Sequence, residues 1–462
     1  MVLFMPRRFP TVPLAPPGPP RRRSGLPPAA ARRDPTLYLQ SLARDYGDVA
    51  RFQFIRRDAY LLSHPDLIRD VLITHARRFM KGEGLQRAKR LLGEGLLTSE
   101  GEQHLKQRRL VQPVFLKNHL QNYAASMGRH ALQTASRWND GQSLDMTREM
   151  GRLTLAVVGE TLFSADVEGE AAELGAALDK SIDLFNSLNS PFAPLFDYLP
   201  FGPSKAFKAA RNRLDSTIFR LINEHRQNEV DNEANNGDLL SLLLSTRYDD
   251  GSAMDDNQLR DEAMTIFLAG HETTANALSW TWVLLARHPE IAAQLGEEAR
   301  RVLGERPATY DDLEKLVFTR QVISESLRLY PPAWVLGRTT LDDYEIEHQN
   351  QQFVIPQGSL VLMSQWVMHR DARFWDAPDV FDPSRWSAEN LDESRPKFAY
   401  FPFSAGTRGC IGEGFAWMEA ILLLAGLAAH WRARLVDDKP IGVEPRITLR
   451  PARAIQMTLE RA

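Results

Sequence analysis

The spacing of apolar residues along the chain predicts a mostly helical protein with a small amount of β-structure. From residue 64 to about residue 330, apolar side chains recur at steps of three and four residues, the period of an amphipathic helix. The stretch 48–64 instead predicts two short strands joined by the charged turn RRD, and NQQFVI (350–355) and GSLVLMSQ (358–365) also have strand character. A helical pattern resumes at 413–433. These patterns together favour a mainly α fold with a minor sheet component.

The first 35 residues differ in composition from the rest of the chain. Residues 5–35 hold ten of the 28 prolines, seven arginines and one acidic residue, which predicts an extended arm over the surface. We therefore divide the chain into a Pro/Arg-rich arm, 1–35, and a single domain, 36–462. The arm lacks the apolar core of a signal peptide, and the apolar run at 420–429 is shorter than the ~18 residues of a membrane span. We expect a cytoplasmic protein without a transmembrane anchor.

Composition and missing motifs narrow the possible chemistry. The 462-residue chain has a formal net charge of −3, so charge gives no reason to expect nucleic acid as a partner. Cys410 is its only cysteine, which rules out an intrachain disulfide and any metal site made of several cysteines. HETTA at 271–275 begins like a zinc-protease helix but has Ala275 where the second histidine is required. No complete phosphate-binding Gly-rich loop or hydrolase nucleophile elbow is present either.

The lone cysteine is therefore the leading candidate for chemistry. Cys410 ends the Gly-rich stretch FPFSAGTRGCIG, just before an apolar helix whose first N–H groups favour a thiolate. Gly406 and Gly412 allow the backbone to approach a flat, bulky body. Phe403 could pack against that body, and Arg408 could pair with its acid groups. A thiolate that ligates iron beneath a macrocycle with carboxylates meets these demands, although a buried structural cysteine is the alternative for Cys410 in isolation.

The whole string FSAGTRGCIG (403–412) satisfies F-x-x-G-x-R-x-C-x-G at every defined position. That pattern is the haem-binding signature of the cytochrome P450 superfamily of haem-thiolate monooxygenases, and the chain resembles this superfamily's soluble, bacterial type. The resemblance implies a cytochrome P450 fold, with haem b between a long distal helix and the proximal cysteine loop. It also implies that Cys410 ligates the iron and that Phe403, Arg408 and Gly412 contact the cofactor.

Further motifs of the family follow in the expected order. ESLR supplies Glu325 and Arg328, which match the family's E-x-x-R and share one face of a helix at positions i and i+3. FDPSRW resembles the segment whose arginine, here Arg385, joins that pair. The resemblance implies a buried network of three side chains that braces the cysteine loop. His369, in VMHRD, is interpreted as a structural residue.

The segment 261–286 resembles the long helix above the distal face of the haem. AGHETT meets the family motif A/G-G-x-D/E-T-T, which places Ala269 and Gly270 beside the cofactor. A threonine hydroxyl can bond the carbonyl four residues earlier and bend a helix, here from Thr273 to Ala269. The resemblance implies that Glu272 and Thr273 are catalytic and relay protons. An ordinary Gly/Thr-rich packing site is the alternative.

Polar residues elsewhere match positions that meet the haem carboxylates. In GEQHLKQRR, His104 and Arg108 are four residues apart and share a helix face, although many members of the family have Trp at the first position. Arg338, in PPAWVLGRTT, is a further candidate to bind a haem carboxylate. Lys106 and Arg109 could help to dock an acidic partner, or could simply form a solvated face.

The substrate is expected above the haem, in a pocket with apolar walls. Phe267, Ala333, Trp334 and Val335 are the candidate lining residues, and each could equally be ordinary core. The apolar stretch SPFAPLFDYLPF (190–201) is a candidate gate. An apolar substrate follows, such as a terpenoid, a fatty acid or a carotenoid-like molecule.

The resemblance implies a haem-dependent monooxygenase that inserts one oxygen atom from O2 by hydroxylation or epoxidation. No flavin or nicotinamide motif occurs in the chain, so electrons are expected from a separate ferredoxin or flavodoxin with its NAD(P)H reductase. Three alternatives stay open: a peroxygenase, an isomerase or dehydratase of the same fold, and a haem-based sensor without turnover. The intact pair Glu272–Thr273 speaks against the first two.

Overall fold

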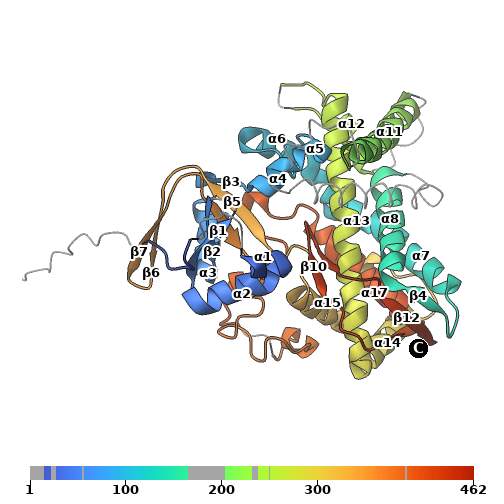
Figure 1. The fold of residues 1–462 in the computed structure, drawn as a ribbon. Helices are drawn as coiled ribbons and strands as arrows, with labels where there is room; N and C mark the ends of the chain where they lie inside the picture. The colour runs from blue at the N-terminus through green and yellow to red at the C-terminus, as the bar shows by residue number, and fades with distance from the viewer. Residues whose placement is uncertain are drawn as a thin grey trace, which may run out of the picture.

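The computed structural model describes residues 15–21, 28–54, 57–164, 203–230, 238–248, 250–390 and 393–462. Most strands gather on one side of the molecule and most helices on the other, with α13 (Asp256–Arg287) running through the helical side (Figure 1). The expected gate at 190–201 lies outside the described residues. Among the described helices, none combines the length and the apolarity that a membrane crossing requires.

Among the described residues, the helices other than α13 range from a single turn to 28 residues. Their bounds are α1 (Ala29–Arg33), α2 (Pro35–Tyr46), α3 (Pro65–Arg69), α4 (Glu83–Arg87), α5 (Lys89–Leu92), α6 (Gly101–Val111), α7 (Lys117–Arg137), α8 (Met146–Phe163), α11 (Pro203–Val230), α12 (Leu239–Ser245), α14 (Pro289–Leu303), α15 (Val317–Leu329), α16 (Gln365–Met368) and α17 (Glu413–Ala428). α15 ends just before Pro331 and Pro332, as the sequence predicts, because proline disfavours the helical conformation in the residue before it.

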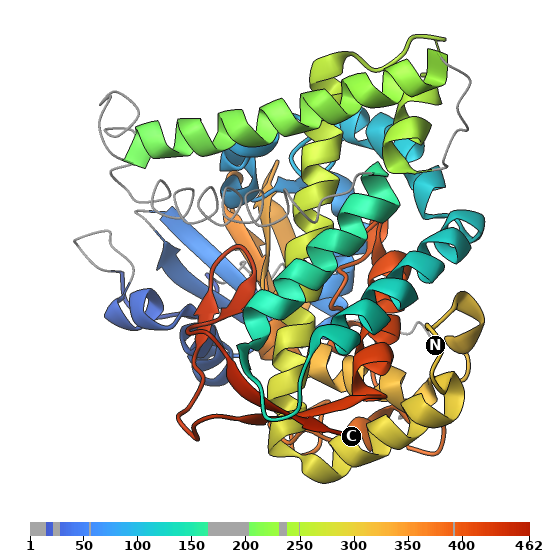
Figure 2. The same ribbon diagram turned by 90° about the vertical axis from the view of Figure 1, so that its right-hand side faces the viewer.

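Capping residues set the two ends of the long helix α13, and apolar residues around most of its circumference bury it in the molecule. The carboxylate of Asp255 accepts a hydrogen bond from the N–H of Gln258 at 2.8 Å, and the helix ends before Pro289. α8 and α17 pack along it and α11 crosses it (Figure 2). Because neighbours cover it on several sides, most of its side chains are buried. An accessible residue in the middle of α13 is therefore a candidate for contact with a ligand.

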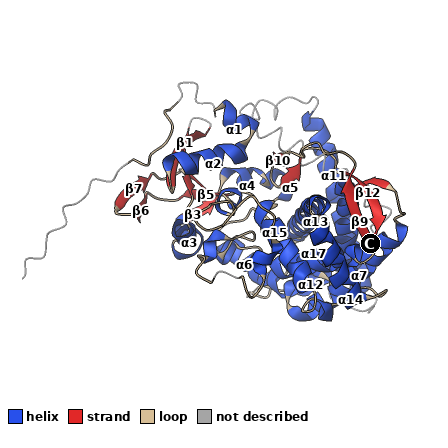
Figure 3. Cartoon of the chain, turned by 90° about the horizontal axis from the view of Figure 1, so that it is seen from below, coloured by secondary structure: helices blue, strands red, loops and turns tan. Residues whose placement is uncertain are grey.

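In the part of the chain that the structure describes, the strands form one larger sheet and three small ones. Their bounds are β1 (Val49–Phe54), β2 (Arg57–Leu62), β3 (Phe79–Lys81), β4 (Ser143–Asp145), β5 (Leu336–Thr340), β6 (Tyr344–His348), β7 (Gln351–Ile355), β8 (Leu360–Met363), β9 (Trp431–Leu435), β10 (Val443–Pro445), β11 (Leu449–Pro451) and β12 (Gln456–Arg461). The five-stranded sheet has the order β1–β2–β8–β5–β3, and within it β2 and β8 run parallel while the other pairs are antiparallel. Strands β9 and β12 lie apart from it, on the helical side of the molecule (Figure 3), and β4 pairs with β12.

The predicted elements agree well with this architecture. The stretch 48–64 forms the antiparallel pair β1 and β2, and the two later strand-like runs form β7 and β8. The main hydrophobic core joins α7, α8, α13, α15 and α17, whereas two smaller cores lie around the five-stranded sheet. The prediction of a mainly α fold with minor β-structure is confirmed.

The N-terminal arm is described only in part. The carbonyl of Pro17 accepts a hydrogen bond from the N–H of Arg51 at 2.7 Å, which lays the segment 15–21 along β1. Residues 29–33 are helical rather than extended, because AAARR combines strong helix formers. The division of the chain at residue 35 stays a prediction.

Candidate functional site

The cysteine loop, residues 401–412, is a tight turn that its own backbone closes. The N–H of Cys410 donates to the carbonyl of Phe403 at 2.9 Å. Gly406 has a φ of 70°, and a β-carbon at this position would lie 2.3 Å from the carbonyl oxygen of Leu72. Both the left-handed backbone and the close neighbour require glycine, so the G-x-R-x-C spacing dictates the shape of the loop.

The environment of Cys410 suits a metal ligand better than a free nucleophile. Its side chain is accessible. Desolvation by the surrounding protein raises the pKa of the thiol to about 11, while the N–H of Gly412 and the charge of Arg108 lower it. Arg108 also donates to the carbonyl of Gly409 at 2.8 Å. A free thiol is therefore protonated at neutral pH, and a bound metal ion would be needed to remove its proton.

Behind the loop, Arg328 is bonded through all five of its N–H donors. Its Nε and Nη2 contact the two carboxylate oxygens of Glu325, each at 2.8 Å. The remaining donors reach the carbonyls of His369, Pro378 and Val380 at 2.6–3.0 Å. Neither Glu325 nor Arg328 is exposed to solvent. A guanidinium with this complete set of acceptors needs no further ligand.

Glu325 gathers three further donors from the segment 382–386. Arg385 Nε donates to its Oε1 at 3.2 Å, and the N–H of Asp382 donates to the same oxygen at 3.1 Å. Trp386 Nε1 donates to Oε2 at 3.0 Å. The structure thus brings Glu325, Arg328 and Arg385 into one network, which we call the closed network, and adds Trp386 to it.

His369 connects the closed network to the cysteine loop. Its carbonyl accepts from Arg328, and its Nε2 accepts from the N–H of Phe401, the first residue of the loop, at 3.0 Å. Full burial and nearby arginine charges hold the pKa of His369 well below its usual range, so the ring is a neutral acceptor. Tyr400 adds a bond from its hydroxyl to the carbonyl of Ser324 at 3.1 Å. The structural interpretation of His369 fits these contacts.

On another side of the loop, positively charged and histidine side chains converge from four segments. We call them the cationic cluster: Lys81 in β3, His104 and Arg108 in α6, Arg338 in β5 and Arg408 in the cysteine loop. Lys81 and Arg338 are direct cross-strand partners in the pairing of β3 with β5. Two like charges at such a position repel each other. The cluster is therefore held together by the fold rather than by internal attraction.

Burial and mutual repulsion weaken the protonated forms of these groups. The pKa of Lys81 falls to about 7, mainly through desolvation, and that of Arg338 falls to about 10. The pKa of His104 falls to about 3, through desolvation and the charges of its cluster neighbours. Glu100 counters part of this charge, since its Oε2 lies 2.8 Å from Arg408 Nη2. The cluster as a whole would gain from additional carboxylates.

The middle of α13 carries an accessible patch within an otherwise buried stretch. Ala269 is exposed, and Gly270 and Thr273 are half-buried, while the residues from 262 to 268 are all buried. Thr273 Oγ1 donates to the carbonyl of Ala269 at 2.7 Å, the bond expected from the sequence. Gly270 faces α8, where an added β-carbon would lie 3.2 Å from Val158 Cγ2.

Glu272 points away from Thr273 and is held by the C-terminal part of the chain. Its Oε1 accepts from Arg450 Nε at 2.7 Å and from the hydroxyl of Thr448. Asn276, one turn further along α13, also bonds Thr448, at 3.2 Å. The acid of the predicted catalytic pair is thus buried and fixed by residues at and beside β11.

Two of the four predicted pocket residues, Phe267 and Trp334, lie in different hydrophobic cores. Phe267 is buried in the main core, with its ring 5.7 Å from Phe163 in an edge-to-face contact. Trp334 is buried in a core beside the five-stranded sheet, and its Nε1 donates to the carbonyl of Arg446 at 2.9 Å. Ala333 and Val335 flank Trp334 and are half-buried. Their role as pocket walls stays a prediction.

Comparison with known proteins decides the family. The family described as "Cytochrome P450" matches residues 16–458, which is nearly the whole chain. The chain belongs to the cytochrome P450 family. Similar curated P450s include the cyclooctatin synthase of Streptomyces melanosporofaciens, 37% identical over 90% of this chain and 89% of that protein. The pentalenene oxygenase of Streptomyces avermitilis is 35% identical over 92% and 93% of the two chains.

This P450 is a monooxygenase, and the family requires haem, O2 and an external redox partner. The residues present fit a haem. The accessible thiol of Cys410 can ligate iron, and the cationic cluster lacks counter-charge of the kind that two haem carboxylates supply. A site built only for packing would not collect several cationic side chains at low dielectric.

Sequence reasoning missed several groups of this P450 site. Lys81 and Glu100 complete the charges around the predicted cluster residues, and both flank α4 and α5 without a recognisable spacing. Thr448 and Arg450 lie more than 170 positions from Glu272, so no local pattern points to them. Trp386 follows Arg385 directly and could have been included with FDPSRW.

Proposed function

We propose that this P450 inserts one oxygen atom from O2 into a C–H or C=C bond of a hydrophobic, terpenoid-like substrate. The observation that carries the proposal is the accessible patch at Ala269 and Thr273 on a helix that is otherwise buried and largely apolar. The names of the relatives support the substrate class, since they include a pentalenene oxygenase and a cyclooctat-9-en-7-ol 5-monooxygenase. Fatty acids and carotenoid-like molecules are the alternative substrates.

The cofactor in this proposal is haem b, which supplies the iron that binds and activates O2. Cys410 would hold the iron from the proximal side, and the cationic cluster would hold the two carboxylates. The residues that would surround the ring are Phe403 and Gly412 on the proximal side and Ala269 and Gly270 on α13. Lys81 joins His104, Arg108, Arg338 and Arg408 as a carboxylate ligand, because its two bonds, to the carbonyls of Leu96 and Ser99, leave its third donor available.

Protons would reach the substrate side through Thr273 and Glu272. The hydroxyl of Thr273 donates to the carbonyl of Ala269 and can rotate to donate to a ligand over the accessible patch. Glu272 can pass a proton to Thr273 Oγ1 only after it leaves Arg450 and Thr448. In this proposal the C-terminal chain therefore controls when the acid takes part.

Electrons would come from a ferredoxin or flavodoxin with its NAD(P)H reductase. Lys106 and Arg109 are exposed on α6, the helix whose other face carries His104 and Arg108. An acidic partner docked there would sit close to the cationic cluster. Reversing both charges is expected to slow electron transfer at low ionic strength and to have little effect at high salt.

A ligand titration tests the proposal directly. Purified holoprotein is titrated with a library of cyclic terpenes, fatty acids and carotenoid fragments, and the haem spin-state change is recorded. We expect saturable changes with terpenes, followed by O2-dependent oxygenated products when partner and NAD(P)H are supplied. NAD(P)H consumption without any oxidised library member would favour the sensor alternative instead. Turnover with hydrogen peroxide that outpaces partner-driven turnover would favour the peroxygenase.

A further inference from the structure

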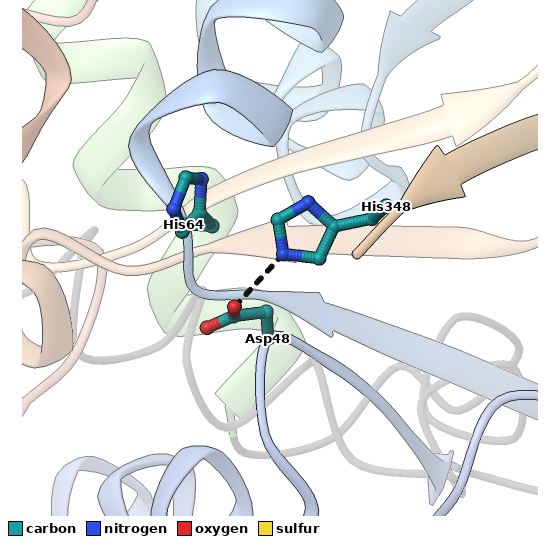
Figure 4. A group of neighbouring side chains, drawn as sticks. All are labelled: Asp48, His64 and His348. Carbon is teal, nitrogen blue, oxygen red and sulfur yellow. Dashed lines mark hydrogen bonds and ion pairs between the residues drawn. The ribbon is translucent and has the colours of Figure 1, made fainter. Parts of the chain in front are cut away.

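A second group of potential metal ligands lies on the strand side of the molecule. Asp48, His64 and His348 each offer one ligand atom, and these atoms all lie within 4.8 Å of one another (Figure 4). They come from three separate segments. Asp48 directly precedes β1, His64 is the N-cap of α3, and His348 ends β6. None of them takes part in the P450 chemistry described above.

The spacing of two of these ligands already approaches that of a metal site. His348 Nε2 lies 2.9 Å from Asp48 Oδ2. Bonds of about 2.0–2.2 Å to a tetrahedral ion place its ligand atoms roughly 3.3 Å apart. The rings of His64 and His348 have centroids 4.7 Å apart and are tilted by 57°. Closing the site therefore requires a modest movement of His64 and little movement of the other two.

The carboxylate is held by groups of the kind that orient a metal ligand. Arg373 Nη1 donates to Asp48 Oδ1 at 2.7 Å, and Gln349 Nε2 donates to Oδ2 at 3.2 Å. Arg373 is itself fixed by Asp371 and by the carbonyl of Ser63. Outer contacts of this kind fix the orientation of metal ligands. Because Arg373 occupies Oδ1, Oδ2 is the oxygen that can face a metal.

Exposure and charge also suit a reversible metal site. The side chain of Asp48 is 7% exposed, that of His348 14% and that of His64 22%, so an ion can enter while the carboxylate stays largely dry. Two imidazoles and one carboxylate are ligands that suit zinc, copper and nickel rather than calcium or magnesium.

We propose that Asp48, His64 and His348 bind one divalent transition-metal ion of the zinc class. The ion takes the place of the proton on His348 Nε2, and that proton moves to Nδ1 or to solvent. The turn between β6 and β7, at Gln349 and Asn350, is thereby fastened to β1 and α3. The hairpin extends from the body of the molecule in Figure 1, and the inward side chains of its two strands pack in a core with α3 and the five-stranded sheet.

The first test measures zinc stoichiometry on the intact holoprotein. The protein is treated with a chelator that leaves the haem in place, titrated with Zn2+, passed over a sizing column and analysed for zinc relative to iron. We expect one zinc per haem iron, and none in the double variant His64→Ala/His348→Ala. His130→Ala is the matched control, because His130 also pairs with a carboxylate, Glu160 at 2.6 Å, and is expected to leave the stoichiometry unchanged.

A second readout guards against a folding defect in the double variant. The single variant His348→Gln keeps a side-chain donor for Asp48, and we expect at least tenfold weaker zinc binding with an unchanged CO spectrum of the reduced haem. The electron paramagnetic resonance spectrum of Cu2+ added to the wild type should show hyperfine coupling to two imidazole nitrogens. The proposal is overturned if the wild type binds no zinc. It is also overturned if His348→Gln and the double variant both bind zinc as tightly as the wild type.

Discussion

Two groups of charged side chains lie on different sides of the cysteine loop and differ in how their charge is satisfied. In the closed network, Arg328 directs all five donors to protein acceptors, and both oxygens of Glu325 are shared among donors. In the cationic cluster, Lys81 and Arg338 stand opposite each other in a strand pair, and the pKa of each is lowered. The protein completes the first group and leaves the second short of negative charge.

This difference separates a structural network from a binding site. A buried ion pair with all its hydrogen bonds made contributes to folding only while every partner is present. Burial and mutual repulsion destabilise the cationic cluster, so a ligand that carries carboxylates stabilises it. Part of the binding free energy of such a ligand offsets this unfavourable electrostatic energy of the empty site. Sequence motifs alone do not distinguish the two, since each group includes arginines that match motifs of the family.

Breaking the closed network should have the largest effect. Arg328→Ala leaves Glu325 buried without its main partner, and we expect the free energy of unfolding to fall by about 3–5 kcal/mol. Because the network serves the fold, the loss should be similar in haem-free and haem-bound protein. Chemical denaturation of both forms measures it, with Arg301→Ala, an exposed position on α14, as a control expected to change little. A loss confined to the haem-bound form would contradict the comparison.

Breaking the cationic cluster should give the reverse pattern. Arg338→Ala removes a buried charge that repels Lys81 and Arg408, so haem-free protein should be as stable as the wild type or slightly more stable. Haem retention should fall by roughly 10–100-fold, since one charge-assisted bond is worth about 1.5–3 kcal/mol. The rate of haem transfer to an acceptor protein measures the effect. Arg338→Lys, which keeps the charge, should restore part of the retention, and a variant that destabilises the haem-free form would argue against the assignment.

The sequence predicted the parts of this comparison that depend on local spacing. Gly406, Arg408 and Cys410 lie in one tight loop, and Glu325 and Arg328 lie one helical turn apart, so a linear motif captures their geometry. Lys81 and Glu100 reach the cluster from elements far from the signature, through the pairing of β3 with β5 and the start of α6. Their place depends on tertiary packing, which no local pattern records. The same holds for Thr448 and Arg450, which reach Glu272 from the far end of the chain.

The pH dependence of haem-free protein sharpens the comparison further. The folded-state pKa of Lys81, about 7, lies below the unfolded value of 10.5, so between these values the unfolded chain binds more protons. Stability attributable to Lys81 should therefore rise as the pH increases from 7 to 9, by about 2 kcal/mol or less. Burial raises the pKa of Glu419 to about 8, so its contribution to the free energy of unfolding falls as the pH increases up to 8. The difference in the free energy of unfolding between wild type and Lys81→Met, measured against pH, isolates the contribution of Lys81. In haem-bound protein, where the haem carboxylates pair with Lys81, this pH dependence should disappear. A pH-independent difference would exclude Lys81 from the cluster.

The smallest effect is expected at Glu272, where two protein donors hold the potential catalytic acid through one of its oxygens. Arg450 and Thr448 both bond its Oε1, so Arg450→Gln should weaken the hold on the acid while Thr448 keeps it in place. We expect a change of only about 1 kcal/mol in stability, together with a few-fold change in partner-driven turnover and in its solvent isotope effect. Arg446→Gln, on the same hairpin and paired with Glu444, is the matched control. If Arg450 acts through the acid, its effect should vanish in a Glu272→Gln background, whereas equal effects in both backgrounds would make Arg450 a purely structural residue.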